Sequence, residues 1–433
     1  MAIPSTTYDI ATITNPTSAL TDFTLMIDLS RMSSAWWAEV DTSDGTRGRA
    51  SKNDGTTELA TDWIDFDDTA ETGLLRVKYT GTLASSGTQI IRVYPPNTGN
   101  SAYGVSDTYG QYNAYSSNWV GYWPLSTDFN DRTSNTNNGT GVGGVVAGDV
   151  SGYIGKATSF NGSEGVDIGA VGLSWAGVNK PASMLAIAKV TTQTSTDIVF
   201  GTRDGIDLWK LQNNNTSWEN QFDPVNGGQT VSASSDLNWV ILQCGYDGTD
   251  IYLDVDNVST TVADSSNFTI GDLWSIGKRG NALSEYFNGN IQHVALYDDN
   301  KNTTWRTEEY SQTNDNATFW GTWTNVPVSG TGYELTLDTG VFTYTGNDLN
   351  LLKDSILETN TGVFNLTGNN LEFSKTNVLT LETGVFNLTG KSLSLIYDDG
   401  SQSAGSSPLG NRPKSYTKRQ KQLYYIDKIL RGI

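Results

Sequence analysis

An internal repeat near the C-terminal end of this 433-residue chain constrains its fold more than any other feature. Residues 339–346 read TGVFTYTG, and residues 361–368 and 383–390 both read TGVFNLTG, at a constant spacing of 22 residues. A fixed period of this kind is typical of units that stack and bury their apolar faces only against their neighbours. Each unit offers about two strands, so residues 324–398 are expected to form a small β-repeat domain.

Two arrangements of the repeats fit this pattern equally well. The first is one small β-sandwich built from duplicated hairpins. The second is part of a fibre shaft that other subunits complete. Asn and Thr recur at equivalent positions of the repeats, and ladders of such side chains would suit side-by-side β packing.

The sequence before the repeats also favours β structure. The 45 glycines and a hydrophobic share of 36% favour thin two-layer cores connected by many turns. Strand-like runs such as 23–29 and 74–79 are separated by turn pairs such as Asp54-Gly55. Further along, the runs 239–245 and 251–255 flank a turn, and residues 304–313 are predicted to form a short helix.

The fold class predicted from these signals is all-β, with tandem β-sandwich or jelly-roll modules, a small repeat β domain and a short C-terminal helix. The expected boundaries are 1–115 for an N-terminal β-sandwich module, 116–323 for a jelly roll, 324–398 for the repeats, 399–411 for a Gly/Ser linker and 412–433 for a basic helix.

The C-terminal segment differs in charge from the rest of the chain. The chain as a whole has a net charge of −20, whereas residues 412–433 hold seven basic residues and one acidic residue. A basic helix with a narrow apolar face could dock on an acidic partner surface, although a solvated tail is an equally good interpretation. The residues expected to anchor it to a virion are Lys418, Arg419, Leu423, Ile426 and Leu430.

Five ordered blocks of the central segment resemble the laminin-G-like, concanavalin-A-like jelly-roll family. They are Tyr122-Trp123-Pro124-Leu125, Gly155-Lys156-Ala157 with the following 159–162, the hairpin 246–254, Ile276-Gly277 and the closing run 287–297. Asp44-Gly45, residues 54–59 and residues 92–94 resemble an uncharacterised bacterial and phage module that often precedes such domains. The TGVFNLTG repeats resemble those near the ends of many phage structural proteins. These resemblances imply a phage virion structural protein with a lectin-like domain.

Composition excludes several classes of partner. An acidic surface with a pI of about 4.3 repels phosphates, so no nucleic acid partner is expected. No run of 18 apolar residues is present, so no membrane insertion is expected. With one cysteine, Cys244, and no signal-peptide pattern at the start, we expect synthesis in a host bacterial cytoplasm and a place on the virion surface.

No catalytic constellation is apparent, so an enzyme is not expected. The only histidine, His293, lies inside a predicted strand, where a packing role is the simpler interpretation. Glycosidases of the concanavalin-like fold need paired carboxylates. Glu39-Val40-Asp41 begins their motif but lacks its final Glu and lies outside the matched segment.

A sugar site is the alternative to catalysis, because lectin-like sites combine an aromatic ring with Asp and Asn side chains. Calcium is the one cofactor that the fold suggests, with Asp128, Asn130 and Asp131 as candidate ligands, although acidic turns are usually just solvated. The candidate ligand-binding residues are Asp204, Asp207, Trp209, Asn214 and Trp218. Both tryptophans also suit the core of a jelly roll, and that core role is the favoured interpretation.

These observations lead to three functional hypotheses. The first is a fibre- or spike-type adhesin that presents its lectin-like domain to a host-surface glycan. The second is a purely structural head-fibre, capsid-decoration or tail component that binds other virion proteins. The third and least favoured is a polysaccharide depolymerase. For a virion protein of this type a homo-oligomer is expected, with a trimer favoured.

Overall fold

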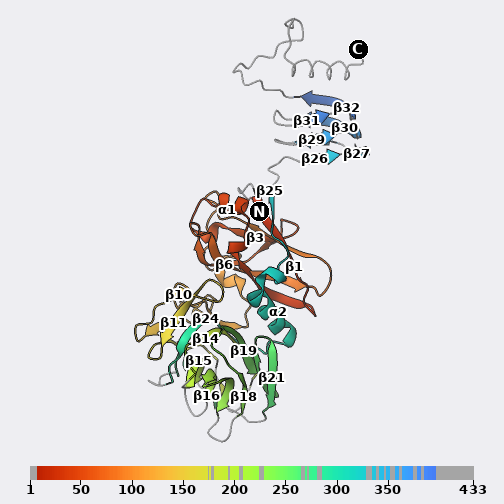
Figure 1. Ribbon diagram of the computed structural model, residues 1–433. Helices are drawn as coiled ribbons and strands as arrows, with labels where there is room; N and C mark the ends of the chain where they lie inside the picture. Colours follow the sequence, from red (N-terminus) through yellow and green to blue (C-terminus); the bar gives the residue numbers. More distant parts are fainter. Residues whose placement is uncertain are drawn as a thin grey trace. The chain divides into compact units, whose positions relative to one another are not determined.

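The computed structural model describes residues 7–395 with gaps, and it divides the chain into two compact units, Met1–Val328 and Ser329–Ile433 (Figure 1). In the second unit it describes only the backbone of the strands between residues 334 and 395. In the first unit the residues left undescribed are 1–6, 174, 177–179, 194–195, 204–207, 224–228, 265–268, 271–272, 280–284 and 328.

The first module of the first unit is a two-layer antiparallel β structure. One sheet has the strand order β25-β1-β7-β3-β4 and the other has the order β2-β6-β5. Their inward-facing side chains, including those of Ile13, Phe23, Val77 and Ile91, form one shared core. The elements are β1 (Thr7–Ile13), β2 (Leu20–Asp28), α1 (Ser34–Ala38), β3 (Arg49–Lys52), β4 (Glu58–Leu59), β5 (Thr61–Asp67), β6 (Thr72–Leu83) and β7 (Gln89–Tyr94), with 3-10 turns at Leu29–Arg31, Gly45–Arg47 and Gln111–Ala114.

A late segment of the chain returns to complete this module. It comprises α2 (Thr303–Asn314), α3 (Asn316–Phe319) and β25 (Thr324–Pro327), and β25 pairs antiparallel with β1. Phe319 and Trp320 are buried in the core of the first module. The boundary expected at residue 323 therefore falls within a segment that packs on the N-terminal strands, because those strands need it to close their core and cover an edge.

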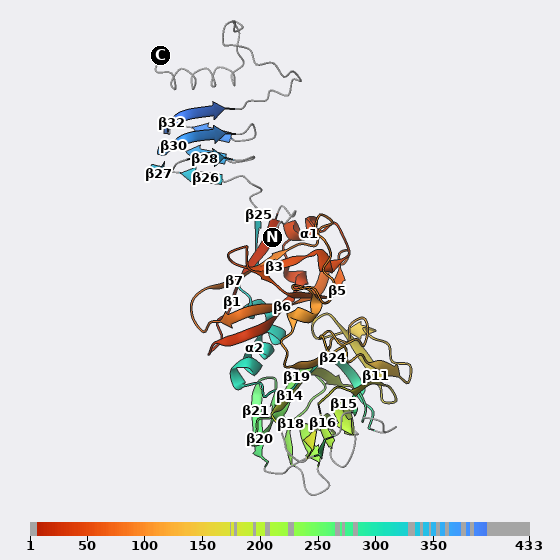
Figure 2. The same cartoon turned by 180° about the vertical axis from the view of Figure 1, so that it is seen from behind.

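The second module is a sandwich of two large antiparallel sheets (Figures 1 and 2). One has the order β10-β11-β24-β14-β19-β20-β21, with β8 also paired to β24, and the other has the order β18-β17-β16-β15-β23-β12-β9. The first sheet contains β8 (Trp119–Trp123), β10 (Val150–Ser151), β11 (Lys156–Asn161), β14 (Ala182–Val190), β19 (Val240–Tyr246), β20 (Asp250–Val255), β21 (Val258–Ala263) and β24 (Asn288–Tyr297). The second contains β9 (Thr140–Val142), β12 (Gly165–Ala170), β15 (Thr196–Arg203), β16 (Leu208–Asn214), β17 (Ser217–Asp223), β18 (Thr230–Ser234) and β23 (Leu273–Ile276), and a separate pair is formed by β13 (Trp175–Ala176) and β22 (Thr269–Ile270).

Strand β14 explains why the two modules form one unit. Met184, Ala186 and Ala188 point into the sandwich core, while Leu185 and Ile187 point to the opposite face. That outer face would be solvated in an isolated antiparallel sandwich. Here it is covered by residues of the first module such as Met26 and Ile64, which share a separate apolar core with it. The junction is therefore a buried interface rather than a flexible linker.

The all-β class predicted from sequence is confirmed, as are two of its local elements. The runs 239–245 and 251–255 form the antiparallel hairpin β19–β20, and Tyr246 pairs with Ile251. The helix predicted at residues 304–313 is α2, which begins at Thr303 with Asn302 as its N-cap.

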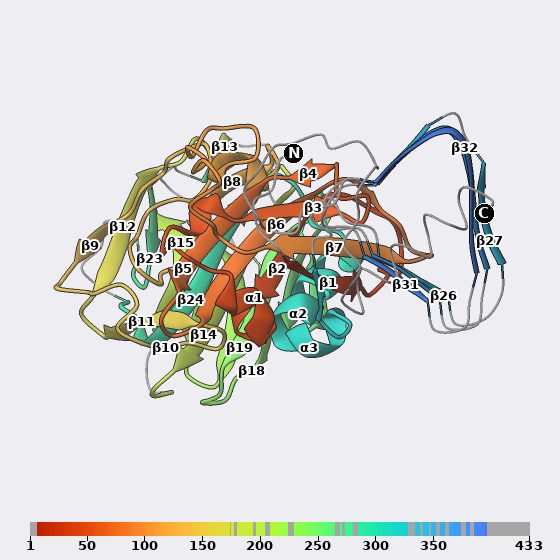
Figure 3. The same ribbon diagram turned by 90° about the horizontal axis from the view of Figure 1, so that it is seen from above.

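The repeats form a stack of parallel strands. Its strands are β26 (Glu334–Leu337), β27 (Val341–Thr345), β28 (Asp348–Leu351), β29 (Ile356–Thr359), β30 (Val363–Phe373), β31 (Val378–Leu381) and β32 (Val385–Leu395). Val341 pairs with Val363, and Val363 pairs with Val385, so each rung is displaced from the next by one 22-residue repeat. Figure 3 looks along this stack, and successive rungs overlie one another.

The parallel pairing contradicts the duplicated-hairpin arrangement, because hairpin strands pair antiparallel. The second expectation, a shaft completed by other subunits, stays a prediction. The linker at 399–411 and the basic helix at 412–433, including the proposed anchor residues, lie outside the described residues. Within the described part of the chain, no helix has both the length and the apolar character needed to cross a bilayer.

Candidate functional site

The two tryptophans proposed for sugar binding lie in the core of the sandwich. Trp209 and Trp218 are both 0% exposed. Trp209 stacks on Phe222 with ring centroids 5.1 Å apart, and its Nε1 donates to Asn220 Oδ1 at 2.9 Å. A side chain enclosed in this way cannot stack on an external sugar, so the ligand-binding role proposed for Trp209 and Trp218 is wrong and the core role is correct.

The remaining candidates of that group do not form a site with them. Asn214 ends β16, where its Nδ2 donates to Glu219 Oε1 at 3.1 Å and its Oδ1 accepts from Thr196 Oγ1 at 3.2 Å. This geometry gives Asn214 a role in pairing neighbouring strands. Asp204 and Asp207 lie outside the described residues.

The acidic turn considered for calcium is held by hydrogen bonds within the chain. Asp131 is 3% exposed and accepts bonds from the backbone amides of Tyr122, Thr133 and Asn137 at 2.9–3.0 Å. Burial raises the pKa of Asp131, although these hydrogen bonds counteract part of the shift. Elsewhere in the described residues, no cluster of three or more His, Cys, Asp or Glu side chains has the geometry to hold a metal ion.

His293 is 1% exposed in β24, and its Nδ1 forms a hydrogen bond with the Tyr122 hydroxyl. Burial, together with the positive charge of Arg76, lowers the pKa of His293 to about 3. A group buried at this depth has no access to a substrate. His293 is therefore a packing residue at the module junction, as its sequence context indicated.

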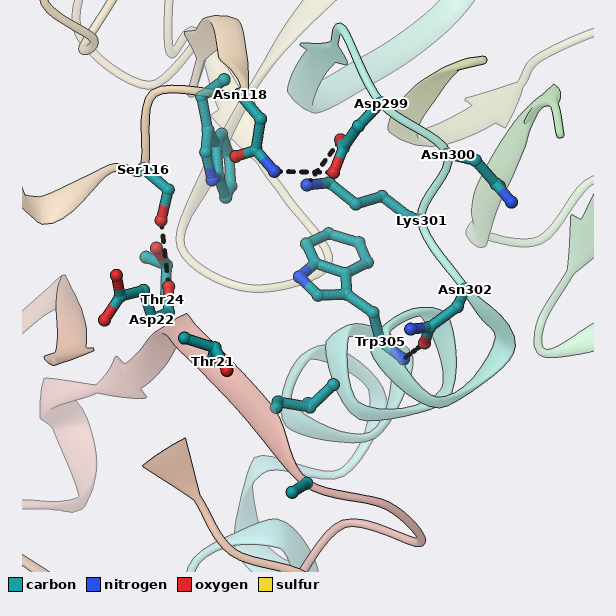
Figure 4. A pocket seen from close by; sticks show the side chains of 13 residues that line it. Thr21, Asp22, Thr24, Ser116, Asn118, Asp299, Asn300, Lys301, Asn302 and Trp305 are labelled. Atoms are coloured by element: carbon teal, nitrogen blue, oxygen red, sulfur yellow. Dashed lines mark hydrogen bonds and ion pairs between the residues drawn. The ribbon is translucent and has the colours of Figure 1, made fainter. Parts of the chain in front are cut away.

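A solvent-accessible cavity of about 280 Å³ opens at the junction of the two modules (Figure 4). Three separate segments form its walls: the start of β2, the turn before β8, and the stretch that joins β24 to α2. The lining residues are Ala19, Leu20, Thr21, Asp22, Thr24, Ser116, Asn118, Trp119, Asp299, Asn300, Lys301, Asn302 and Trp305.

One wall of the cavity carries a short polar chain. Asn118 Nδ2 donates to Asp299 Oδ2 at 2.7 Å, and Lys301 Nζ lies 2.8 Å from Asp299 Oδ1. Burial lowers the pKa of Lys301, and the Asp299 carboxylate counteracts part of this shift. Asn118 Oδ1 is buried and accepts no hydrogen bond from the described residues, so the amide contributes to the wall through the bond that it donates to Asp299.

Two indole rings also line the cavity. Trp305 is partly buried in the first turn of α2, and Trp119 lies at an angle to it with the ring centroids 6.4 Å apart. Lys301 Nζ lies 5.1 Å from the centroid of the Trp305 ring and 4.6 Å from that of Tyr297. The cavity thus places an indole beside amide, carboxylate and ammonium groups, a combination suited to a polyhydroxylated ligand.

A buried polar network holds the walls of the cavity in place. Arg76 of β6 pairs with Glu309 of α2 at 2.9 Å, and both side chains are at most 1% exposed. Burial by itself lowers the pKa of Arg76, but Glu309 raises it, and the net pKa lies well above its usual value. Asp62 of the first module accepts from the Tyr115 hydroxyl at 2.6 Å and pairs with Arg132. The first contact ties α2 to β6, and the other two tie the segments on either side of β8 to β5.

Sequence reasoning missed this cavity. Its residues lie in segments almost 300 positions apart, and none of them forms a local motif. The one signal available was the predicted helix at 304–313, which places Trp305 in its first turn and leaves a run of Asp, Asn and Lys just before it.

Comparisons with known proteins give structural neighbours only. No family model matches the chain, and no curated protein matches it. Among solved structures, this chain is similar to domain 4 of AbnA, a GH43 extracellular arabinanase from Geobacillus stearothermophilus, in complex with arabinotriose. The sequence identity is 18%, the match covers 46% of this chain and 97% of that chain, and the TM-score is 0.37.

It is also similar to the receptor binding domain of botulinum neurotoxin D, with 10% identity, 45% and 52% of the two chains covered, and a TM-score of 0.36. The binding domain of botulinum neurotoxin DC in complex with SialylT gives 7% identity, coverage of 45% and 51%, and a TM-score of 0.38. This chain spans about half the length of the two neurotoxin domains.

Proposed function

We propose that this protein is a non-enzymatic, glycan-binding adhesin on the surface of a bacteriophage virion. The observation that carries the binding part of the proposal is the junction cavity. It brings the partly buried Trp305 together with Asn118, Asp299 and Lys301 in a space of about 280 Å³, close to the lower end of the volumes typical of small-ligand sites.

The chemistry of the walls fits a sugar better than a purely apolar ligand. Sugars present hydroxyl groups that pair with amide and carboxylate side chains, and C–H faces that pack on indole rings. The cavity supplies both kinds of surface, with the Asp299 carboxylate and the Lys301 ammonium as its charged groups and Trp305 as its indole. The site is preformed, because its walls are fixed by the buried pair Arg76–Glu309.

The virion part of the proposal is supported by the repeats. Their resemblance to repeats of phage structural proteins suggests this setting, and their in-register parallel strands suit a shaft that projects a binding module. Mass spectrometry of purified virions from a host strain that encodes the chain tests this part directly. Absence of the protein from purified virions would overturn the virion part of the proposal.

A binding screen tests the glycan part. The full-length protein is applied to a polysaccharide and bacterial-cell array, with calcium and with EDTA. Saturable binding is expected, and Thr21→Trp should abolish it because Thr21 is an exposed side chain on the cavity wall. The matched control is Thr261→Trp on the edge strand β21, also at an exposed threonine, which should bind like the parent protein.

A second variant addresses the aromatic wall. Trp305→Ala should weaken binding about tenfold, which corresponds to the loss of about 1.4 kcal/mol of stacking. Trp323→Ala is the control, because Trp323 is also partly buried but lies in the first module beside Trp320. Equal binding by the parent and Thr21→Trp proteins would show that the cavity is not the glycan site.

A further inference from the structure

A second cavity, of about 340 Å³, lies next to the first. The two cavities share three lining residues, Asp22, Ser116 and Trp119, so they lie on either side of one short wall. A ligand that crosses this wall would occupy both spaces. Two adjoining cavities suit a chain of sugars better than a single sugar.

The two cavities differ in the groups they offer. In the first, the charged groups Asp299 and Lys301 are paired with each other, and Asn118 also donates to Asp299. The second offers the Lys78 ammonium, which donates, and the hydroxyls of Tyr112, Ser117 and Ser134, which can donate or accept. Within the described residues, no intramolecular hydrogen bond or ion pair engages these four side chains.

Lys78 is the group that distinguishes the second cavity. It lies partly buried in the middle of β6, opposite Thr24 of β2, and no carboxylate of the described residues lies within ion-pairing distance of its ammonium. Asp22, the other charged residue of this cavity, already accepts a hydrogen bond from the backbone amide of Gly81 at 2.6 Å. Lys78 is therefore a cation without an ion-pair partner, in a cavity that three hydroxyl side chains also line.

We infer that the two cavities form one groove for an acidic oligosaccharide, in which Lys78 binds the carboxylate of one sugar and the Trp305 cavity holds the neighbouring sugar. This inference rests on the proposed glycan-binding function and adds the substrate class. An ammonium beside a carboxylate forms a charge-assisted hydrogen bond, which is stronger than a bond between neutral groups.

The negative net charge of the chain helps to distinguish binding of acidic sugars at one site from non-specific attraction. At −20, the protein as a whole repels acidic polymers, and the basic segment 412–433, which could attract them non-specifically, is unchanged in a Lys78 variant. A preference for a carboxylate-bearing sugar that is lost with Lys78 must therefore come from the groove.

The test uses the full-length protein and oligosaccharides from acidic bacterial capsules, each supplied in its native form and with its carboxylates reduced to hydroxymethyl groups. Binding is measured by calorimetry. The native form is expected to bind about tenfold more tightly than the reduced form. Lys78→Gln should abolish this difference and Lys78→Arg should keep most of it. Lys189→Gln, which removes a similarly half-buried lysine of β14, should leave the difference unchanged.

The outcomes separate the two proposals. Equal affinity for native and reduced oligosaccharides, or a difference that persists in Lys78→Gln, overturns the acidic-groove inference while the glycan-binding proposal stands. If neither the native nor the reduced oligosaccharide binds, and no neutral sugar binds, the glycan-binding proposal and the acidic-groove inference are both wrong.

Discussion

At the residue scale, His293 has an unusual backbone and an unusual environment. Its φ of 52° lies in the left-handed region, which few non-glycine residues adopt. Its Nδ1 bonds the Tyr122 hydroxyl, and its ring is buried at the module junction. Burial disfavours the charged imidazolium, and protonation would also place a second positive charge near Arg76, so the folded protein favours the neutral imidazole.

His293 should make stability depend on pH. Its pKa is about 3 in the folded protein and about 6.5 in an unfolded chain, so between these values the unfolded state binds the extra proton. Stability contributed by the neutral form is complete above pH 6.5 and falls as the pH is lowered toward 3. The expected loss between pH 7 and pH 5 is about 2 kcal/mol.

Urea unfolding at a series of pH values measures this effect. His293→Asn is the comparison, since Asn tolerates the left-handed backbone and does not titrate. Because the chain has one histidine, the variant should lose most of the pH dependence between pH 5 and 7. The same slope in both proteins would contradict the assignment.

At the element scale, α2 covers an edge of the first module. β2 is the edge strand of its sheet, and residues after the sandwich satisfy its outer backbone groups. Gln312 Oε1 accepts from the Met26 amide at 2.7 Å, and Trp320 Nε1 donates to the Met26 carbonyl at 2.9 Å. An edge covered in this way is closed to pairing with another chain.

The ion pair Arg76–Glu309 is expected to be essential to this docking. Glu309→Gln leaves the buried Arg76 without its counter-charge and should cost about 3 kcal/mol or more in unfolding free energy. Asp65→Asn is a matched control, since the Asp65–Lys156 pair involves a lysine with 48% of its side chain exposed. That change should cost less than about 1 kcal/mol. Similar losses in the two variants, measured by chemical denaturation, would rule out a special role for the buried pair.

At the scale of the whole molecule, the two modules of the first unit depend on each other. The chain enters the sandwich after residue 115 and returns at Thr303 to finish the first module. Neither module therefore corresponds to a segment that can be removed without exposing a core of the other. The repeats, in contrast, lie in a unit of their own.

Truncation distinguishes these relationships. A chain that ends at residue 328 should unfold in one cooperative calorimetric transition, because the shared core at the junction couples both modules. A chain that ends at residue 302 lacks α2, α3 and β25, which uncovers β2 and leaves Arg76 unpaired. Its first module should lose cooperative unfolding. A chain ending at 302 that melts like the longer one would refute the coupling.

The sequence by itself determined the features that depend on near neighbours in the chain. Strand composition and turn pairs predicted the all-β class and the β19–β20 hairpin, and the helix at 304–313 could be placed within a residue of its start. The core role of Trp209 and Trp218 was also within reach, because large aromatic side chains on alternating strand positions usually face a sandwich core.

Only the tertiary structure decided which elements meet. A repeated strand pattern is compatible with parallel or antiparallel pairing. The structure shows that the repeats stack as parallel strands, because Val363 pairs with Val385, its equivalent in the next repeat. The sequence of β14 shows an apolar outer face but does not indicate which element packs on it. The cavity at the junction is lined by segments near residues 20, 117 and 302, which only the fold brings together. Local side-chain periodicity encodes which face of a strand is buried, but the element that buries it is chosen by long-range packing.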